Sequence, residues 1–298
     1  VMCDFEDDDF STMLRRSGFR QILAKDTFVH HFGGMTLNEV RTKRGKYKSI
    51  VSMRPVFRDK WKVDPWESRG QLSFLDEFLK DVCGDHSPVR VLLIEPMFGD
   101  GLLSIRNYFR KQRRVFSIEA IVTDARYLAD TYHMADSVRQ MEDLDHLAEE
   151  LNERYDMIVV GVPLNNLTVT HIMPFFQMCH AHLNPHGFIY ATMRNYNSFE
   201  HTMESLPNHI PHLAYANIMS INGTRIFPVV RLIAALEKEF SAQSVRIGYS
   251  MKARLFEGAE SYEAEVLKIA EVEGKEKAEL CRLLAGDTIV FCICQGRM

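Results

Sequence analysis

The chain has 298 residues, of which 46% are hydrophobic and 26% are charged, and its formal net charge is −4. This length and apolar content can support one large core or two smaller ones. The slightly acidic balance provides no basic field for nucleic acid, so we predict no nucleic-acid partner. No apolar run reaches the roughly 18 residues of a membrane span, so we also predict no transmembrane helix.

Cysteine usage and the first residues indicate a compartment. The six cysteines include no Cys-x-x-Cys pair, and several stand in apolar surroundings, as buried thiols do in a reducing compartment. Segment 4–9 is acidic, unlike a secretory leader. We therefore predict a cytoplasmic protein.

The first predicted element is a helix over 7–19. Its first turn is acidic, and Arg15 and Arg16 lie near its end, which complements the helix dipole. A basic and aromatic segment over 46–63 also has helical spacing, with an interruption at Pro55.

From about Trp66 onward, apolar segments with strand character alternate with amphipathic helical segments. The predicted pairs, helix before strand, are 72–82 with 89–94, 102–112 with 118–123, 125–132 with 137–141, 144–154 with 157–162, and 170–182 with 188–192. Such alternation predicts an α/β fold with a parallel sheet covered on both faces. The last part differs, with helices over 229–240 and 262–284 and strands over 245–249 and 288–294.

The segment 91–101 carries the strongest functional signal. A buried strand ends at Glu95, a turn contains Gly99 and Gly101, and a helix follows. A strand, a glycine turn and a helix N-terminus together predict a nucleotide-cofactor site. The spacing Gly99-x-Gly101-x-x-Ser104 is similar to the dinucleotide fingerprint, while Asp124, after the second strand, suits a ribose in either a dinucleotide or another nucleotide cofactor.

Three later features favour one cofactor. Glu142 and Asp143 follow the third strand, where an adenine amino group could be read. Segment 155–163 is a strand followed by a turn, and 182–190 is a helix end, a Pro/Gly turn and a fifth strand. With the first turn, these features resemble the class I S-adenosylmethionine-dependent methyltransferases over 68–298.

This resemblance implies a doubly wound, mostly parallel, Rossmann-like sheet of seven strands that ends in an antiparallel hairpin, formed by 245–249 and 288–294. It implies S-adenosylmethionine as the cofactor. The cofactor-binding residues it implies are Glu95, Met97, Gly99, Gly101, Asp124, Glu142, Asp143 and Val162.

The chain departs from the family at two places. Met97 stands where the family has its first glycine, so its side chain would crowd the methionine tail of the cofactor. Asn184 and His186 replace the usual lysine and glycine before the fifth strand.

The N-terminal 64 residues carry a second pattern. Acidic residues at a helix start are ordinarily a solvated cap. Here, however, the ordered segments 5–10, 14–19, 28–33 and 57–61 resemble the end of the catalytic domain of family-2 glycosyltransferases. We therefore predict a small glycosyltransferase α/β remnant over 1–64 and a methyltransferase-like domain over 68–298.

The glycosyltransferase resemblance implies that Asp7 is the general base that takes the proton from an acceptor hydroxyl. It places His31 near a diphosphate or its metal, although a structural histidine is an equal alternative. The nucleotide-binding half and the Asp-x-Asp motif of that family lie upstream of the matching segments. We therefore expect a longer bifunctional protein, in which alone nucleotide sugar and divalent metal are used, and no glycosyl transfer by this chain.

The expected activity is methyl transfer from S-adenosylmethionine to a small-molecule or glycan acceptor, with a sugar suggested by the fused segment. His171, after the fourth strand, suits a general base but also an ordinary surface histidine. Asn165, Asn166 and Arg194 stand where they could meet the acceptor. Two alternatives remain: a non-catalytic module that binds cofactor or glycan, and an NAD-type oxidoreductase. The sequence predicts no particular oligomeric state.

Overall fold

The computed structural model of the chain describes residues 5–22, 24, 26–30, 48–64, 72, 75, 78–79, 88–195, 219–221, 224–226, 229–251 and 286–295. His31, the predicted helix over 262–284 and most of the one over 72–82 lie outside the described residues. None of the helices in the described ranges combines the length and hydropathy that a bilayer crossing requires.

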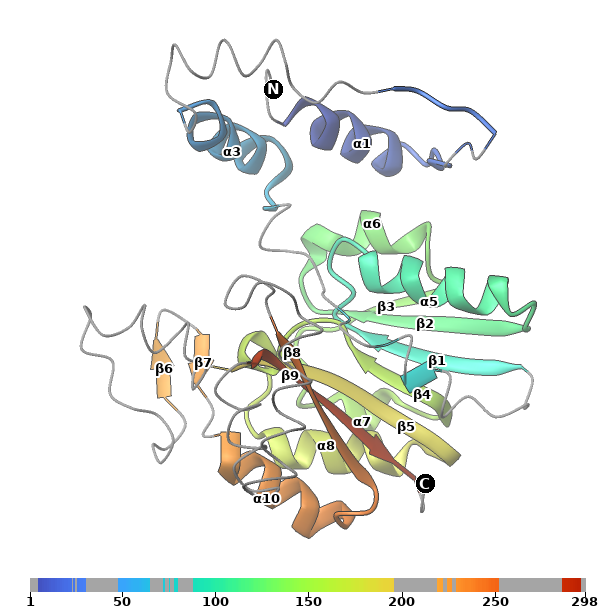
Figure 1. Cartoon of the computed structure of the whole chain (residues 1–298), viewed down its shortest axis with the longest axis vertical. Coiled ribbons are helices and arrows are strands. Elements are labelled where there is room, and N and C mark those ends of the chain that lie inside the picture. The colour runs from blue at the N-terminus through green and yellow to red at the C-terminus, as the bar shows by residue number, and fades with distance from the viewer. Residues whose placement is uncertain are drawn as a thin grey trace, which may run out of the picture.

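A seven-stranded sheet organises the molecule, in the order β3-β2-β1-β4-β5-β9-β8 (Figure 1). The strands are β1 Val89–Ile94, β2 Phe116–Val122, β3 Ser137–Gln140, β4 Tyr155–Val160, β5 Leu183–Arg194, β8 Val245–Met251 and β9 Gly286–Cys294. The first five run parallel, and β9 runs antiparallel to both β5 and β8. This confirms the predicted doubly wound, mostly parallel, Rossmann-like sheet with an antiparallel C-terminal pair.

Helices cover both faces of the sheet, as a largely parallel sheet requires. They are α5 Asp100–Lys111, α6 Leu128–Tyr132, α7 Leu147–Glu150, α8 Ile172–Ala181 and α10 Val229–Phe240, with short 3-10 turns η1 Ala125–Tyr127 and η2 Leu164–Asn166. Figure 1 shows α5 and α6 on one side of the sheet, and α7, α8 and α10 on the other. Successive residues of β1 serve the two cores: Leu93 packs with the α5 side, while Leu92 packs with the α8 side.

Several elements differ from the predictions. Strand β5 begins at Leu183, so the Pro/Gly turn predicted before a strand over 188–192 lies inside this strand. The predicted helix over 144–154 forms only the single turn α7, because Leu151 is extended and the carbonyl of Leu151 lies 3.1 Å from the ring of His182. The helix must also end several residues before Tyr155, because β4 begins there. A short antiparallel pair that no pattern predicted, β6 Met219–Ile221 with β7 Thr224–Ile226, lies beside the main sheet.

Two N-terminal helices, α1 Glu6–Arg16 and α3 Lys48–Trp61, lie on the α6 side of the molecule (Figure 1). Pro55 lies inside α3, which continues through it. The buried rings of Phe5 and Phe57 share a cluster with Phe98, from the turn after β1, and Tyr127, from η1. The N-terminal helices therefore share a core with the sheet region, whereas the domain boundary near 64–68 stays a prediction.

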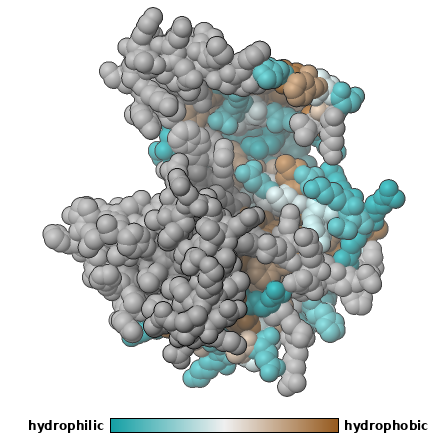
Figure 2. All heavy atoms as spheres, viewed as in Figure 1, coloured by the Kyte–Doolittle hydropathy of each residue, from teal (hydrophilic) through white to brown (hydrophobic). Residues whose placement is uncertain are grey.

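Apolar side chains remain on the surface of the N-terminal part. Figure 2 shows brown atoms where this part projects beyond the sheet, and Phe19, Ile22 and Phe28 are among its exposed residues.

Candidate cofactor-binding site

The turn after β1 has a left-handed backbone at three positions. Glu95, Met97 and Gly99 have φ of 56°, 53° and 86°, and α5 begins at Asp100. Glycine takes this conformation without strain, whereas side chains with a β-carbon take it at a cost. Met97 thus has a backbone conformation that glycine adopts most easily. It stands where the family that the sequence resembles has its first glycine.

Glu95 ties this turn to the end of β2. Its side chain is 5% exposed, and Oε1 accepts a hydrogen bond of 3.0 Å from the Thr123 amide and another from the Thr123 hydroxyl. Burial raises the pKa of Glu95; the bonds from Thr123 oppose this rise and the neighbouring Asp124 adds to it. The carboxyl group therefore positions two loops rather than facing solvent.

Asp124 follows β2 and caps η1, accepting a 3.0 Å bond from the Arg126 amide. The Arg126 Nε lies 2.9 Å from each carboxylate oxygen, and Nη2 bonds Oδ2 as well. The hydrogen bonds from Arg126 lower the pKa of Asp124, although partial burial opposes this. An ionised carboxylate is thus held at the end of β2, and its predicted contact with a nucleotide ribose stays a prediction.

A pocket of about 810 Å³ opens at this edge of the sheet, with a volume suited to a cofactor or substrate. Its lining residues come from the end of α3, the turn after β1, η1 and η2; they are Arg58, Asp59, Lys62, Val63, Asp64, Met97, Arg126, Tyr127 and Asn166. Of the predicted cofactor residues, Met97 belongs to this lining. The N-terminal segment supplies one wall, which the sequence did not predict.

The two glycines of the turn have close neighbours. A β-carbon at Gly99 would lie 1.9 Å from Met134 Cε, and one at Gly101 would lie 2.7 Å from Leu72 Cδ1. Both atoms are ends of flexible side chains that can shift, whereas the φ of 86° at Gly99 favours glycine in itself. The predicted contact of the two glycines with a cofactor stays a prediction.

The remaining predicted cofactor residues follow β3 and β4. Glu142 is exposed, and Asp143 Oδ1 accepts bonds from the amides of Asp145, at 3.0 Å, and His146, at 3.2 Å. Val162 is buried in the core on the α8 side. Their roles toward adenine and cofactor stay predictions.

The predicted acceptor-side residues separate in the structure. Asn165 is 1% exposed, and its Oδ1 accepts a 2.7 Å bond from the Arg194 amide, so it joins the loop after β4 to the end of β5. Asn166 lines the pocket. His171 is exposed at the start of α8 and is not among the described residues that line the pocket.

The acidic segment at the start of α1 contacts the end of α3. Asp9 accepts bonds of 2.8 Å from Lys60 Nζ and 2.6 Å from Trp61 Nε1, which joins α1 to the end of α3. Asp7, the predicted glycosyltransferase base, is exposed. Within the described ranges no group of three or more metal-ligating side chains is assembled.

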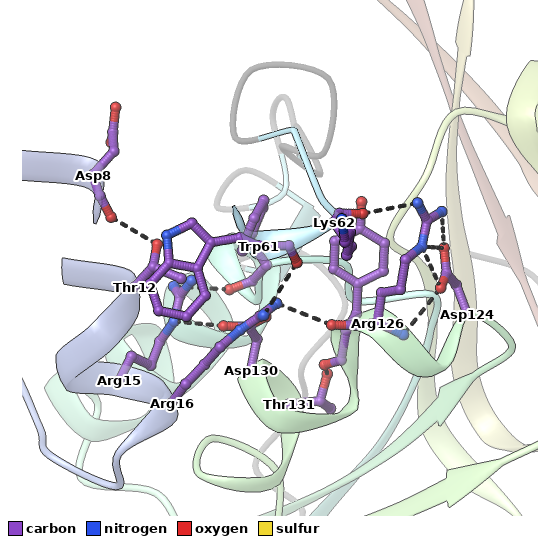
Figure 3. Close-up of polar contacts among 12 residues, drawn as sticks. Asp8, Thr12, Arg15, Arg16, Trp61, Lys62, Asp124, Arg126, Asp130 and Thr131 are labelled. Atoms are coloured by element: carbon purple, nitrogen blue, oxygen red, sulfur yellow. Dashed lines mark hydrogen bonds and ion pairs between the residues drawn. The ribbon is translucent and has the colours of Figure 1, made fainter. Parts of the chain in front are cut away.

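Two polar features escaped the sequence analysis. Arg126 binds Asp124 two residues away, and the Asp-x-Arg spacing at a helix start was the available signal. Arg15 and Arg16 of α1 bind Asp130 of α6, with Nε–Oδ1 at 2.9 Å and Nη2–Oδ2 at 2.8 Å (Figure 3). The second contact spans more than a hundred residues, so no local pattern could reveal it.

No family model and no curated protein matches the chain. Among solved structures, a SAM-dependent methyltransferase from Archaeoglobus fulgidus is 13% identical with a TM-score of 0.44, covering 80% of this chain and 98% of that one. One from Geobacter sulfurreducens, in complex with S-adenosylhomocysteine, is 10% identical with a TM-score of 0.41, covering 76% and 91%. The plantazolicin methyltransferase BamL is 14% identical with a TM-score of 0.43, covering 96% and 99%. Identities and TM-scores this low carry no conclusion about activity or substrate.

Proposed function

We propose that the chain binds S-adenosylmethionine at the carboxyl ends of β1, β2 and β4 and transfers its methyl group to a polar acceptor. The observation that carries this proposal is the pocket at those strand ends, bounded by Met97 and Arg126, in a sheet whose C-terminal strands are antiparallel. The carboxyl ends of parallel strands are where open α/β sheets bind ligands.

The residues present fit a nucleoside cofactor. Asp124 is an ionised acceptor suited to ribose hydroxyls. Arg126, which binds Asp124, lines the pocket together with Tyr127 and Asn166, and Glu95 holds the turn after β1 against the end of β2. The cofactor, when bound, supplies an already activated methyl group. The chain's own task is then to orient the acceptor and exclude water.

We propose a sugar or glycan as the acceptor. The support is the N-terminal segment with its glycosyltransferase-like motifs, whose end forms one wall of the pocket through Lys62 and Asp64. The assignment of Asp7 as a glycosyltransferase base, with nucleotide sugar and metal, belongs to this same proposal and to a longer protein.

A dinucleotide oxidoreductase is the second candidate, because Gly99, Gly101 and Asp124 suit it as well. The classic dinucleotide fold has a fully parallel sheet in the order 3-2-1-4-5-6. Here the last strand of the chain, β9, inserts antiparallel between β5 and β8. That insertion favours the methyltransferase proposal.

Calorimetric titration tests the proposal. S-adenosylmethionine and S-adenosylhomocysteine should bind with micromolar affinity, NAD should not, and Asp124→Ala should weaken binding at least tenfold. Asp156→Ala is a matched control, because Asp156 lies on β4, where Oδ2 accepts a bond from the Arg90 amide on the neighbouring strand β1. Binding of NAD alone would establish the second candidate instead. Cofactor binding without methyl transfer to any glycan would indicate a non-catalytic module.

A further inference from the structure

Arg126 occupies the carboxylate that the proposed function assigns to the ribose. A carboxylate offers about four lone-pair sites. In Asp124 one is taken by the Arg126 amide, and three contacts come from the Arg126 side chain. A ribose diol donates two hydrogen bonds, so it can reach this carboxylate only if the guanidinium moves.

The same guanidinium holds the N-terminal segment. Arg126 Nη1 donates a 2.9 Å bond to the Lys62 carbonyl, and Figure 3 shows Arg126 between Asp124 and Lys62. The guanidinium is planar and rigid, so it cannot turn away from Asp124 and keep its present bond to Lys62. Lys62 in turn lines the pocket.

The backbone of Arg126 continues the connection toward α1. Its carbonyl accepts a 3.0 Å bond from Arg16 Nη2, and Arg16 Nη1 donates to the Trp61 carbonyl at 3.3 Å. The Arg16 guanidinium also lies over the Trp61 ring, 5.3 Å from its centroid. Residues 61–62 are thus held by two arginines, of which one also holds the proposed ribose carboxylate.

We propose that Arg126 is a positioning residue that competes with the cofactor ribose for Asp124 and thereby couples cofactor binding to the position of residues 61–62. The inference rests on the proposed function. The Arg126 side chain is 57% exposed. It can therefore move into solvent, and its ion pair with Asp124 contributes only a modest free energy. Exposed ion pairs of this kind are worth roughly 0.2–1 kcal/mol, which corresponds to an affinity change of about 1.4- to 5-fold.

Calorimetry with S-adenosylhomocysteine on the full chain tests the competition. Arg126→Ala should bind about 1.4- to fivefold more tightly than the wild type, because one carboxylate oxygen loses all its present donors. Arg126→Lys, which cannot hold both oxygens in a plane, should lie between the two. Arg110→Ala, at an exposed arginine in the last turn of α5, should bind as the wild type does. Melting temperatures without ligand establish that each variant is folded.

Fluorescence tests the coupling. The chain has two tryptophans, and Trp66→Phe leaves Trp61 as the sole tryptophan, which is excited selectively at wavelengths that tyrosine does not absorb. S-adenosylhomocysteine should change Trp61 emission in this background, and the change should shrink in Arg126→Ala.

The outcomes separate the two claims. If the wild type binds S-adenosylhomocysteine but Arg126→Ala binds equally or more weakly, the inference fails and the proposed function stands. A constant Trp61 emission at saturation would overturn the coupling in the same way. If neither the wild type nor Arg126→Ala binds, the proposed function itself fails.

Discussion

Met97 combines a left-handed backbone, with φ of 53°, and a partly buried side chain that packs against two hydrophobic clusters. We expect Met97→Gly to change the free energy of unfolding by less than about 1 kcal/mol. Relief of roughly 1–3 kcal/mol of backbone strain offsets the loss of a partly buried side chain, worth about 1–2 kcal/mol. The same variant should bind S-adenosylhomocysteine more tightly, since the pocket gains room. Urea unfolding and calorimetry measure the two effects.

Met97→Ala is the matched control. Alanine also removes the side chain but keeps a β-carbon in the left-handed region, so it should be less stable than Met97→Gly by about 1 kcal/mol. Equal stability of the two variants would show that the turn relaxes and that Met97 stores no strain.

Glu95 makes stability depend on pH. Its pKa in the fold is raised above the ordinary value of 4.5, chiefly by burial. The proton therefore binds more tightly in the folded state, and the stability this provides is lost as pH rises from 4.5 through the raised pKa. Glu95→Gln stays neutral and keeps the acceptor for the Thr123 amide. The difference in unfolding free energy between variant and wild type should move in the variant's favour across this window and then level off.

Urea unfolding at a series of pH values measures this difference. Carboxylates that do not interact with Glu95 titrate alike in both proteins and cancel. A difference that moves in the wild type's favour as pH rises would mean that Glu95 gains more from Thr123 than it loses by burial.

At the scale of elements, α1 is held to α6 by Asp130, whose side chain is 0% exposed, while Arg15 and Arg16 are only partly exposed. We expect the double variant Arg15→Met/Arg16→Met to lose roughly 3–5 kcal/mol of unfolding free energy, because a buried carboxylate is left without these partners. Asp130→Asn should cost less, since the two arginines can still reach water. Replacing all three with Met, Met and Leu should recover most of the loss. Chemical denaturation distinguishes these cases, and a larger loss in Asp130→Asn than in the double variant would contradict the account.

The elements also show what a sequence can predict. Strand β1 and helix α10 begin and end where their patterns predict, because hydrophobic periodicity within one element is local information. Helix α7 is shorter than predicted, since its end depends on a contact with His182, about thirty residues away. The candidate site divides in the same way. Glu95 and Asp124 were singled out because they follow strands, and their contact with a cofactor stays a prediction. The wall formed by Lys62 and Asp64 depends on packing between distant segments.

At the scale of the molecule, the N-terminal segment and the sheet region share both a core and a pocket. Phe5 and Phe57 pack with Phe98 and Tyr127, and five residues between 58 and 64 line the pocket, namely Arg58, Asp59, Lys62, Val63 and Asp64. Two domains joined only by a linker would share neither. The resemblance that divides the chain at 64–68 thus describes its sequence motifs, while the packing crosses that division.

Deletion of residues 1–64 tests this integration. The shortened chain should melt at a lower temperature than the full chain, because it exposes Phe98 and Tyr127 and leaves Asp130 without Arg15 and Arg16. It should also bind S-adenosylhomocysteine more weakly, since one wall of the pocket is missing. The triple variant that neutralises the Asp130 cluster separates the two causes, as it removes the charge problem while the wall stays in place. If the shortened chain instead melts and binds as the full chain does, then residues 1–64 are an independent appendage and the division at 64–68 is a true domain boundary.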